Sequence, residues 1–553
     1  MRDPLPFELR RRIRRLRAAN PIARARARRS LPRLPPGLAR KLPGGGGRHV
    51  LLVSLTEDVE QAKLEALLAK ALQAHGGRVT VYVFRSSRRS VELFRALGVD
   101  ELAFYEDVAP PRGDAAAEAE RIVAGCTTVH DYKELTYRGA RVGRQALSTV
   151  VRARHDAAVD VESDQLRREI TAAVAVGIEG VHASERLLDG IRPDVLLMVE
   201  RGYAGLGALS DVALERDVPV VQFGSAHRDD AFFLKRYTRR NRDLQQRSLD
   251  EQTWSELLAE GWSDEKDDEL RAELDARETG KWFLARRVRH ARRRRDPAEL
   301  RRELGLDDRK VAVLFSHVLW DASMFFGRDL YPDQAAWFVE TVRLAAADDR
   351  VQWLVKLHPA LFWKLRAEGV ETEPAEVALL RERIGELPPH VKLLDPAADV
   401  ANTDLFQLLD AGVTIRGTVG IELPQLGVPV LTAGTSDYAG RGFTVDAETI
   451  EDYERNVRGI AELERLSPEQ VELAKLYAYG VFCRRPWRFS SFRIEYLPPS
   501  DERGVPHLVH LEVADEQQLR AAEDLRAFAD WVLRSDDADF TRPAARAWTA
   551  TRS

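Results

Sequence analysis

The chain has 553 residues, too many for one ordinary hydrophobic core and enough for two domains with additional segments. Apolar content of 44% and charged content of 31% describe a soluble globular protein. A net charge of −4 excludes a protein that binds polyelectrolytes through its overall charge. Two cysteines exclude a disulfide framework and a zinc site with four cysteine ligands, and they fit a reducing compartment.

Residues 1–47 form a basic segment, most of which reads "FELRRRIRRLRAANPIARARARRSLPRLPPGLARKLPGGGG". Its final glycines predict a flexible hinge. The segment has no secretory h-region, and no apolar run in the chain is long enough to span a bilayer. Two interpretations stay open: a solvated, disordered tail, or attachment to an anionic membrane surface. A nucleic-acid or targeting role is the least favoured. We therefore expect a cytoplasmic protein, located at the inner face of the plasma membrane if the second interpretation holds.

Strand-like and helix-like runs alternate after residue 47, and this pattern predicts a parallel sheet covered by helices on both faces. A helical insertion over 112–190 interrupts the alternation. We interpret 48–230 as a first Rossmann-like domain. Its expected strands are 48–55, 78–84, 101–107, 193–200 and 218–224.

The next segment, 231–305, is charged, helical in its spacing and without a strand-like run, so it reads as a connector. The basic run near its end, "RRVRHARRRRDPAELRRELGL", is typical of a solvated helix face.

A second alternation occupies 306–484 and predicts a second Rossmann-like domain. Its expected strands are 310–316, 351–357, 391–396, 412–417 and 428–433, and its expected helices include 333–347, 375–386 and 403–410. Residues 485–553 form a helical extension without a clear sheet pattern, and its closing helix 515–533 could pack on either domain. The predicted fold is α/β, with two doubly wound domains that face a cleft.

Ligands of open parallel sheets bind outside the carboxyl ends of the strands, so the residues that follow each strand are the candidates for a site. In "IRGTVGIELPQLGVPVLTAG" (415–434), the turn at Gly417 and Thr418 starts a short helix, with Thr418 as its expected N-cap. Helix amino termini bind phosphate readily. Gly417 and Gly420 would let the backbone approach the phosphate, and Glu422 would accept hydrogen bonds from ribose hydroxyls.

Positive charge or hydrogen-bond donors near such a phosphate could come from three further residues, Lys356, His358 and Arg416. A second reading remains open, in which this is an ordinary βαβ turn with Glu422 at a solvent edge. His317 and His358 could likewise be scaffold residues at strand ends.

Several segments together resemble the bacterial capsule polysaccharide biosynthesis proteins, which are GT-B glycosyltransferase-like. They are "LFSHVLWDA", "YPDQAAWFVETV", "VQWLVKLHP", "IRGTVGIELPQLGVPVLTAGTSDYAGRGFTVDAETIEDY", "AKLYAYGVFCRRP" and "VERGYAGLGALSDVALERDVPVVQFG". The resemblance covers most of 190–490. It implies a nucleotide-sugar donor on the second domain and a glycan or lipid-linked glycan acceptor near the first. By this analogy His358, Thr418, Gly420 and Glu422 bind the donor, and Ser316, His317 and Asp321 lie near its phosphates or the transferred sugar.

The implied reaction is glycosyl transfer to a capsule or surface polysaccharide. Its candidate bases are Glu200, His227 and Asp321, with Glu200 and Asp321 preferred. No H-E-x-x-H, P-loop or EF-hand spacing is present, so we expect no metal, no cofactor and no nucleic-acid partner. The alternatives are a nucleotide-sugar epimerase or polyol-phosphate transferase on the same scaffold, and a non-catalytic polysaccharide assembly protein.

Overall fold

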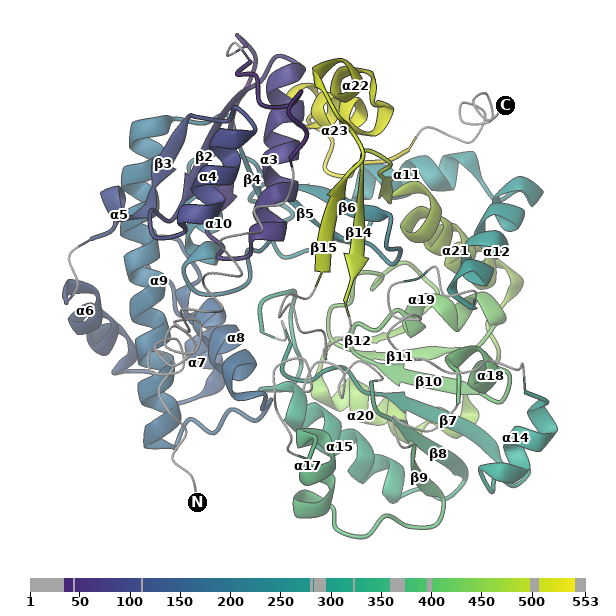
Figure 1. Ribbon diagram of the computed structural model, residues 1–553. Helices are drawn as coiled ribbons and strands as arrows, with labels where there is room; N and C mark the ends of the chain where they lie inside the picture. The colour runs from purple at the N-terminus through teal and green to yellow at the C-terminus, as the bar shows by residue number, and fades with distance from the viewer. Residues whose placement is uncertain are drawn as a thin grey trace, which may run out of the picture.

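A computed structural model describes residues 34–42, 45–110, 113–278, 282, 295–321, 324–358, 373–394, 400–497 and 507–542. Within these residues the chain forms two α/β lobes, each built around its own sheet and covered by helices (Figure 1). The predicted fold class, two Rossmann-like domains with helical insertions, is confirmed.

The first lobe contains a seven-stranded sheet in the order β13-β6-β5-β4-β1-β2-β3. Strands β1 to β5 are parallel, whereas β6 is antiparallel to β5 and to β13. Counted along the chain, the first six strands have the Rossmann order 3-2-1-4-5-6. The bounds are β1 His49–Ser54, β2 Arg78–Val83, β3 Leu102–Phe104, β4 Val195–Met198, β5 Val220–Ser225, β6 Ala231–Tyr237 and β13 Trp487–Arg488.

Helices cover both faces of this sheet because alternate side chains of each strand point in opposite directions. In β1, Val50 and Leu52 belong to one core, and Leu51 and Val53 belong to the other. Both sets are buried, which explains the continuous apolar run in the sequence. The helices are α3 Val59–Ala74, α4 Arg88–Ala96, α5 Tyr105–Val108, α6 Asp114–Val123, α7 Val129–Glu134, α8 Val142–Arg154, α9 Asp164–Ile191 and α10 Leu206–Glu215.

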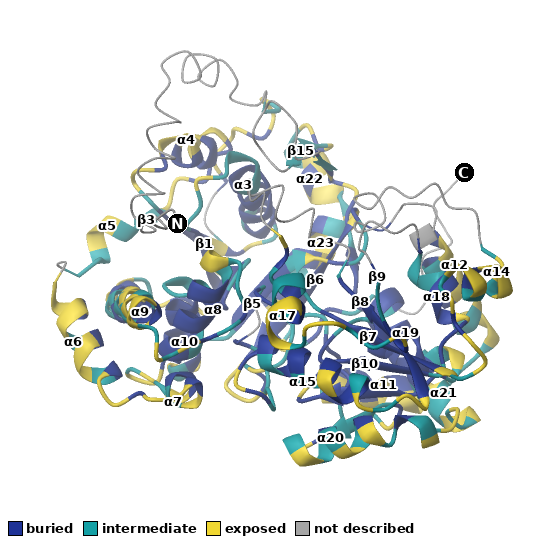
Figure 2. Cartoon of the chain, turned by 90° about the horizontal axis from the view of Figure 1, so that it is seen from below, coloured by how far each residue is buried: buried dark blue, intermediate teal, exposed yellow. Residues whose placement is uncertain are grey.

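The second lobe contains a six-stranded, fully parallel sheet in the order β12-β11-β10-β7-β8-β9, which is again the Rossmann order. Its strands are β7 Lys310–Phe315, β8 Val351–Lys356, β9 Val391–Leu394, β10 Ala411–Thr414, β11 Val430–Ala433 and β12 Val445–Ala447. Figure 2 shows these strands buried beneath partly exposed helices. The helical elements are α15 Gln334–Ala346, α17 Ala375–Arg383, α18 Asn402–Phe406, α19 Val419–Glu422, η1 Pro424–Leu426, α20 Ile450–Arg458, η2 Ile460–Glu462 and α21 Pro468–Tyr479.

The segment predicted as a strandless connector contains β6, so that prediction is wrong. The sequence "AFFLKRY" hides its strand character because Lys235 and Arg236 interrupt the apolar run, yet all seven residues are buried. Lys235 forms a fully buried ion pair with Asp539, 2.7 Å away, and this pairing stabilises a charge inside the sheet. Turns and irregular structure follow over 238–250. The helices of the segment are α11 Glu251–Glu260, α12 Asp264–Glu278 and α14 Pro297–Glu303. The basic run over 283–294 lies outside the described residues.

The carboxyl-terminal segment returns to the first lobe after η3, Gly480–Arg484 (Figure 1). It adds β13 to the sheet edge and places α22 Glu516–Ala521 and α23 Glu523–Arg534 beside α3. It also contains an antiparallel pair, β14 Phe492–Tyr496 and β15 His507–Leu511. The expectation that this extension lacks strands is therefore wrong. The alternation of Phe492, Ile494 and Tyr496 with Arg493 and Glu495 is the pattern of a half-buried strand, and the sequence prediction overlooked it because the run is only five residues long.

Residues 1–33 and 43–44 of the predicted basic tail lie outside the described residues. The described stretch 34–42 is packed, because Leu38 and Leu42 are buried in the first lobe and Gly37 forms a β-bridge with Asp515. Over this stretch the chain differs from a free tail. No described helix is both long and apolar enough to cross a membrane.

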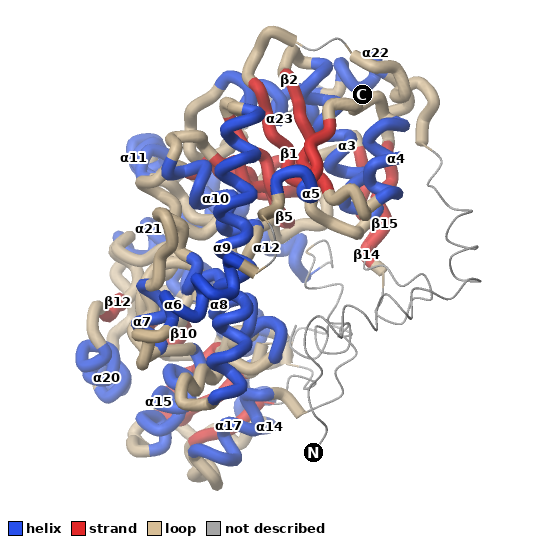
Figure 3. Tube along the Cα trace, turned by 90° about the vertical axis from the view of Figure 1, so that its left-hand side faces the viewer, coloured by secondary structure: helices blue, strands red, loops and turns tan. Residues whose placement is uncertain are grey.

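The two lobes exchange buried side chains. Val318, Trp320 and Met324, from the loop after β7, belong to the core of the first lobe. In return, Ala157, from the loop after α8, belongs to the core of the second lobe. In Figure 3 the two sheets occupy separate lobes, and α8 lies towards the second one. The loops after β7 and α8 therefore hold the lobes against each other.

Candidate functional site

The candidate residues follow strands that flank the topological switch point of each sheet, the position where ligands of doubly wound folds bind. In the first sheet this point lies between β4 and β1, and β4 is followed by Glu200. In the second it lies between β7 and β10, which are followed by His317 and the turn at Gly417. The Tyr203 hydroxyl of the first lobe donates to Asp321 Oδ1 of the second at 3.3 Å. The residues after β4 and those after β7 therefore meet.

Glu200 is held by the backbone that follows it. Its Oε1 atom accepts the amide N–H groups of Arg201 at 2.7 Å and Gly202 at 2.6 Å. Burial raises the pKa of the Glu200 carboxyl, and the nearby charge of Asp321 raises it further, against the opposing effect of the two amides. A fixed carboxylate with a raised pKa suits a general base.

Asp321 lies across from Glu200 in a polar setting. Its Oδ1 atom receives the Tyr203 hydroxyl and lies 3.5 Å from the Arg152 guanidinium. Arg152 in turn sits over the Trp320 ring, with its Cζ atom 4.8 Å from the ring centroid. These contacts hold the Asp321 side chain in place. Arg152 was missed from the sequence because it lies in the helical insertion, far from any strand end.

His227 does not join the other two candidate bases. Its Nε2 atom lies 3.0 Å from Glu273, and its ring packs against Trp282 and Phe482. Burial lowers the pKa of the imidazole, although Glu273 opposes the shift. His227 thus belongs to a buried aromatic and acidic cluster beside the connector helices.

The turn after β10 is tied to the end of β7 by His317. The Nε2 atom of His317 accepts the amide N–H of Arg416 at 3.0 Å and lies 3.3 Å from the Thr414 hydroxyl. Burial and the nearby His358 and Arg416 charges lower the pKa of His317 to about 3. A neutral imidazole is required here, because a protonated Nε2 could not accept from an amide. We assign His317 a positioning role.

The amide N–H groups at the start of α19 have no acceptor within the helix itself. Within the described part of the chain, those of Thr418 and Val419 donate to no other group, and Thr418 is half-buried. Thr418 occupies the N-cap position as predicted, but its backbone is already helical and its hydroxyl makes no capping hydrogen bond. Since α19 has four residues, any ligand of these amides gains from direct hydrogen bonds more than from a helix dipole.

Both predicted glycines are explained by packing. A Cβ atom on Gly420 would lie 2.0 Å from the Tyr438 hydroxyl, which donates to the Gly417 carbonyl at 2.9 Å. A Cβ atom on Gly417 would lie 2.8 Å from the Thr414 hydroxyl oxygen. Glycine is therefore required at both positions by neighbouring groups of the protein, which leave no room for a side chain. The close approach of a phosphate, which we expected, is not needed to explain either glycine.

Arg416 is engaged inside the protein. Its guanidinium donates to Asp329 at 2.6 Å and to the Thr435 carbonyl at 2.9 Å. Asp329 also pairs with Lys133 of the first lobe, at 3.2 Å, and all three side chains are at most 10% exposed. Arg416 therefore links the turn to the opposite lobe. From the sequence we had instead expected Arg416 to contact the phosphate directly. Asp329 and Lys133 were not singled out from the sequence, because neither lies near a strand end.

Lys356 and Ser316 bind groups of the second lobe. The Lys356 ammonium donates to the Val400 carbonyl at 3.2 Å, and burial lowers its pKa to about 8. The Ser316 hydroxyl accepts the His358 amide at 3.1 Å. His358 itself is half-buried and close enough to lower the pKa of His317. Of the predicted phosphate-facing side chains Lys356, His358 and Arg416, only His358 is partly exposed.

Glu422 is buried, with 6% of its surface exposed, and does not lie at a solvent edge.

Arg247, from the connector, was not singled out from the sequence. It pairs with Asp437 through two contacts of 2.7 and 3.0 Å and also donates to the Arg416 carbonyl. This arginine joins the connector to the turn. Among the described residues, no group of three His, Cys, Asp or Glu side chains is placed to hold a metal ion.

The fold and the position of these residues define an α/β protein of two Rossmann-like domains, in which the residues after β4 of one sheet meet the residues after β7 of the other. No protein-family model matches the sequence, and no curated protein matches it either.

Solved structures with a similar fold include the β-Kdo 2,4 transferase KpsC of Thermosulfurimonas dismutans, at 16% identity and a TM-score of 0.31, over 52% of this chain and 79% of that one. They also include the UDP-GlcNAc 2-epimerase of Neisseria meningitidis bound to UDP-GlcNAc, at 13% identity and a TM-score of 0.25, over 78% and 96%. The S. aureus MnaA–UDP structure has 12% identity and a TM-score of 0.29, over 79% and 93%.

Proposed function

We propose that this protein is a metal-independent glycosyltransferase that moves a sugar from a nucleotide-sugar donor to a capsule or surface polysaccharide, or to its lipid-linked acceptor. One observation carries the proposal: Glu200, at the switch point of one sheet, is anchored by two amides, has a raised pKa and lies beside Asp321 of the other lobe. The resemblance of the sequence to capsule polysaccharide proteins supports it. The donor would occupy the second lobe, and the acceptor would occupy the first.

In the proposed reaction the acceptor hydroxyl loses its proton to Glu200 as its oxygen forms a bond to the anomeric carbon. The bond from that carbon to the phosphate oxygen breaks, and its electron pair stays on the phosphate. The amides of Thr418 and Val419, with His358, would stabilise that charge. Glu422 would bind the donor ribose. Lys356, Ser316, His317, Arg416, Gly417 and Gly420 would shape the donor site from behind through their contacts within the second lobe and across to the first.

A panel of nucleotide sugars tests the proposal, with binding measured as a thermal shift and products measured by mass spectrometry. A bound nucleotide sugar stabilises the folded state in proportion to the logarithm of its concentration. We expect His358→Ala and Glu422→Ala to reduce the shift, whereas Glu200→Gln keeps the shift and lowers transfer by about 10²–10⁴-fold. The matched controls are His130→Ala and Glu120→Gln, which change exposed residues of α7 and α6.

The outcomes separate the candidate functions. Elongation of a glycan supports the transferase. A nucleotide sugar that changes its configuration without an acceptor would establish the epimerase instead. If no nucleotide produces a shift, the protein is a non-catalytic member of this fold, and both enzymatic readings fail.

A further inference from the structure

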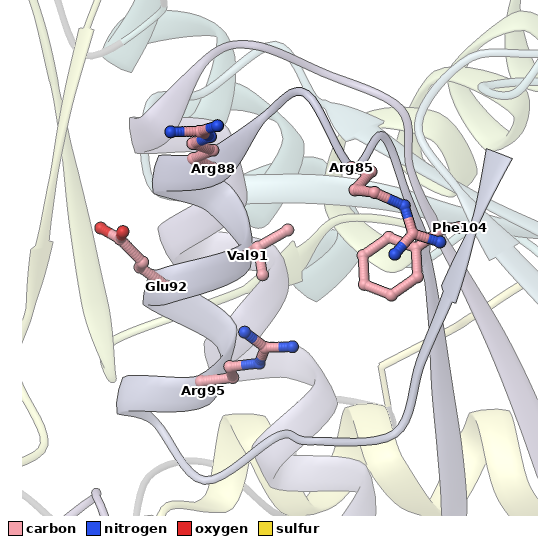
Figure 4. A pocket seen from close by; sticks show the side chains of 6 residues that line it. All are labelled: Arg85, Arg88, Val91, Glu92, Arg95 and Phe104. Atoms are coloured by element: carbon pink, nitrogen blue, oxygen red, sulfur yellow. The ribbon is translucent and has the colours of Figure 1, made fainter. Parts of the chain in front are cut away.

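A groove on the first lobe lies between α4 and the edge strand β3, away from the residues described above (Figure 4). It encloses about 270 Å³. Six residues line it: Arg85, Arg88, Val91, Glu92, Arg95 and Phe104. Three of the six are arginines, whereas the floor is apolar, with Val91 buried and Phe104 half-buried.

Two of the arginines have no ionic partner among the described residues. Arg88 and Arg95 lie seven positions apart on one face of α4, and both are exposed. Glu92 lies between them at the spacings where helical ion pairs form, yet within the described part of the chain it pairs with neither arginine. Figure 4 shows the reason for Arg95: its guanidinium points towards the Phe104 side of the helix, and the Glu92 carboxylate points to the other side.

The third arginine is fixed in place. The Arg85 guanidinium lies over the Phe104 ring, with its Cζ atom 4.2 Å from the centroid, and pairs with Asp107 at 2.5 Å. Its charge is therefore largely neutralised, and its flat face extends the apolar floor. The groove thus combines two uncompensated cations with a surface of ring and aliphatic carbon.

We propose that this groove binds a phosphate ester, with the phosphate on the guanidinium groups of Arg95 and Arg88 and the attached apolar group against Val91 and Phe104. Guanidinium groups bind phosphate through paired hydrogen bonds, and these two are not occupied by a carboxylate of the protein. The volume accommodates a phosphate with a short chain or one ring, and is small for a complete nucleotide sugar.

The position of the groove suggests its natural occupant. Arg85 follows β2 and Phe104 ends β3, so the groove opens near the same carboxyl ends that carry Glu200 after β4. Strand β2 is two places from β4, roughly 10 Å away. The phosphate of a lipid-linked or phosphorylated glycan acceptor could be held there. This occupant rests on the proposed function, whereas binding of a phosphate ester does not.

Titration calorimetry with hexyl phosphate and with inorganic phosphate, in the absence of any nucleotide, tests the site. We expect hexyl phosphate to bind more tightly than inorganic phosphate, because its methylene groups meet the apolar floor. Arg88→Ala/Arg95→Ala should weaken hexyl phosphate binding at least 10-fold, and Glu92→Gln should strengthen it. Arg89→Ala is the matched control, since it removes an exposed arginine of the same helix that does not line the groove. It should change binding less than 2-fold.

Failure to bind both hexyl phosphate and anionic vesicles would overturn the proposal. An equal loss in Arg89→Ala would overturn it too, because it would indicate an unspecific attraction to charge. Sedimentation with phosphatidylglycerol vesicles distinguishes the source of the phosphate. Sedimentation that depends on Arg95, without binding of the soluble ester, would keep the phosphate site and assign it to bilayer headgroups. Glu200→Gln should bind hexyl phosphate normally, so a failure of the proposed transfer reaction would be seen separately.

Discussion

Glu200 illustrates how one carboxylate is set by its immediate surroundings. Two amides of its own loop fix Oε1, burial raises its pKa, and Asp321 from the opposite lobe adds to the shift. A base acts in its deprotonated form, so a raised pKa moves the loss of activity on acidification to a higher pH. The acidic limb of the pH profile therefore reports on Glu200.

Replacing Asp321 by Asn should move that limb to lower pH, because the nearby negative charge that raises the Glu200 pKa is removed. The measurement is kcat/KM against pH for the wild type and the variant. Asp537→Asn, a change of an exposed residue, should leave the limb in place. A limb that stays fixed in Asp321→Asn, or moves upward, would show that Glu200 and Asp321 are not coupled as described.

Gly420→Ala should destabilise the protein by about 1–3 kcal/mol, because the added methyl collides with the buried Tyr438 hydroxyl. Denaturant unfolding measures the loss. In the double variant Gly420→Ala/Tyr438→Ala the loss should be smaller than the sum of the two single losses, since the ring carbons Cζ and Cε2, 2.2 and 2.5 Å from the added Cβ, are removed with the hydroxyl. Gly190→Ala in α9, where nothing lies within 4 Å of the new atom, should be neutral or stabilising. A Gly420→Ala protein as stable as the wild type would contradict this packing.

At this scale the sequence could place residues but not their partners. Glu200, Asp321 and the 415–422 turn follow strands that apolar runs reveal, so their location at the strand ends was predictable. The neighbours of Arg416 and Gly420 were not, because Asp329 and Tyr438 reach them through folding. The predicted phosphate ligands Arg416 and Lys356 are instead engaged inside the protein.

Strand β6 depends on a partner from the far end of the chain. Lys235 in β6 and Arg485 after η3 both pair with Asp539, at 2.7 and 3.2 Å, and the three side chains are fully buried. Two cations share one carboxylate, so removal of that carboxylate would leave both uncompensated in the interior.

Asp539→Ala should therefore lower the free energy of unfolding by about 3–5 kcal/mol. Chemical denaturation against Asp537→Ala, an exposed neighbour in sequence, provides the comparison. If Asp539→Ala loses no more free energy of unfolding than the control, water must solvate Lys235 and Arg485 in place of the carboxylate. The three side chains would then not form a dry, buried cluster.

The same elements show where sequence periodicity fails. Central strands such as β1 and β7 are apolar at nearly every position because both faces are buried, and they were predicted correctly. Strands at or near the sheet edge carry charges whose partners are distant in sequence, as in β6, so their pattern resembles that of a helix or loop. Element type was thus readable wherever burial alone decides it.

For the whole molecule, the exchange of buried side chains couples the two lobes. Trp320, from the second lobe, is 1% exposed within the first lobe's core, and its ring lies 4.7 Å from that of His155. Each lobe also has a core of its own. Their unfolding should be one cooperative transition only as long as this interface holds.

Trp320→Ala should cost about 3–5 kcal/mol and divide the calorimetric transition into two, because the deleted ring is the largest side chain that crosses between the lobes. Trp353→Ala, which removes an equally buried tryptophan within the second lobe alone, should destabilise without dividing the transition. A single transition in both variants would show that other contacts are enough to couple the lobes.

The return of the chain to its first lobe has a consequence for biosynthesis. Strand β13 and helices α22 and α23 complete that lobe, although hundreds of residues separate them from β1. A ribosome that has released the chain as far as η3 has therefore produced a complete second lobe, while the sheet of the first lobe still has one edge bare and α3 is uncovered. The lobe translated first is the one that is finished last, and a chaperone would have to shield it until the final segment emerges.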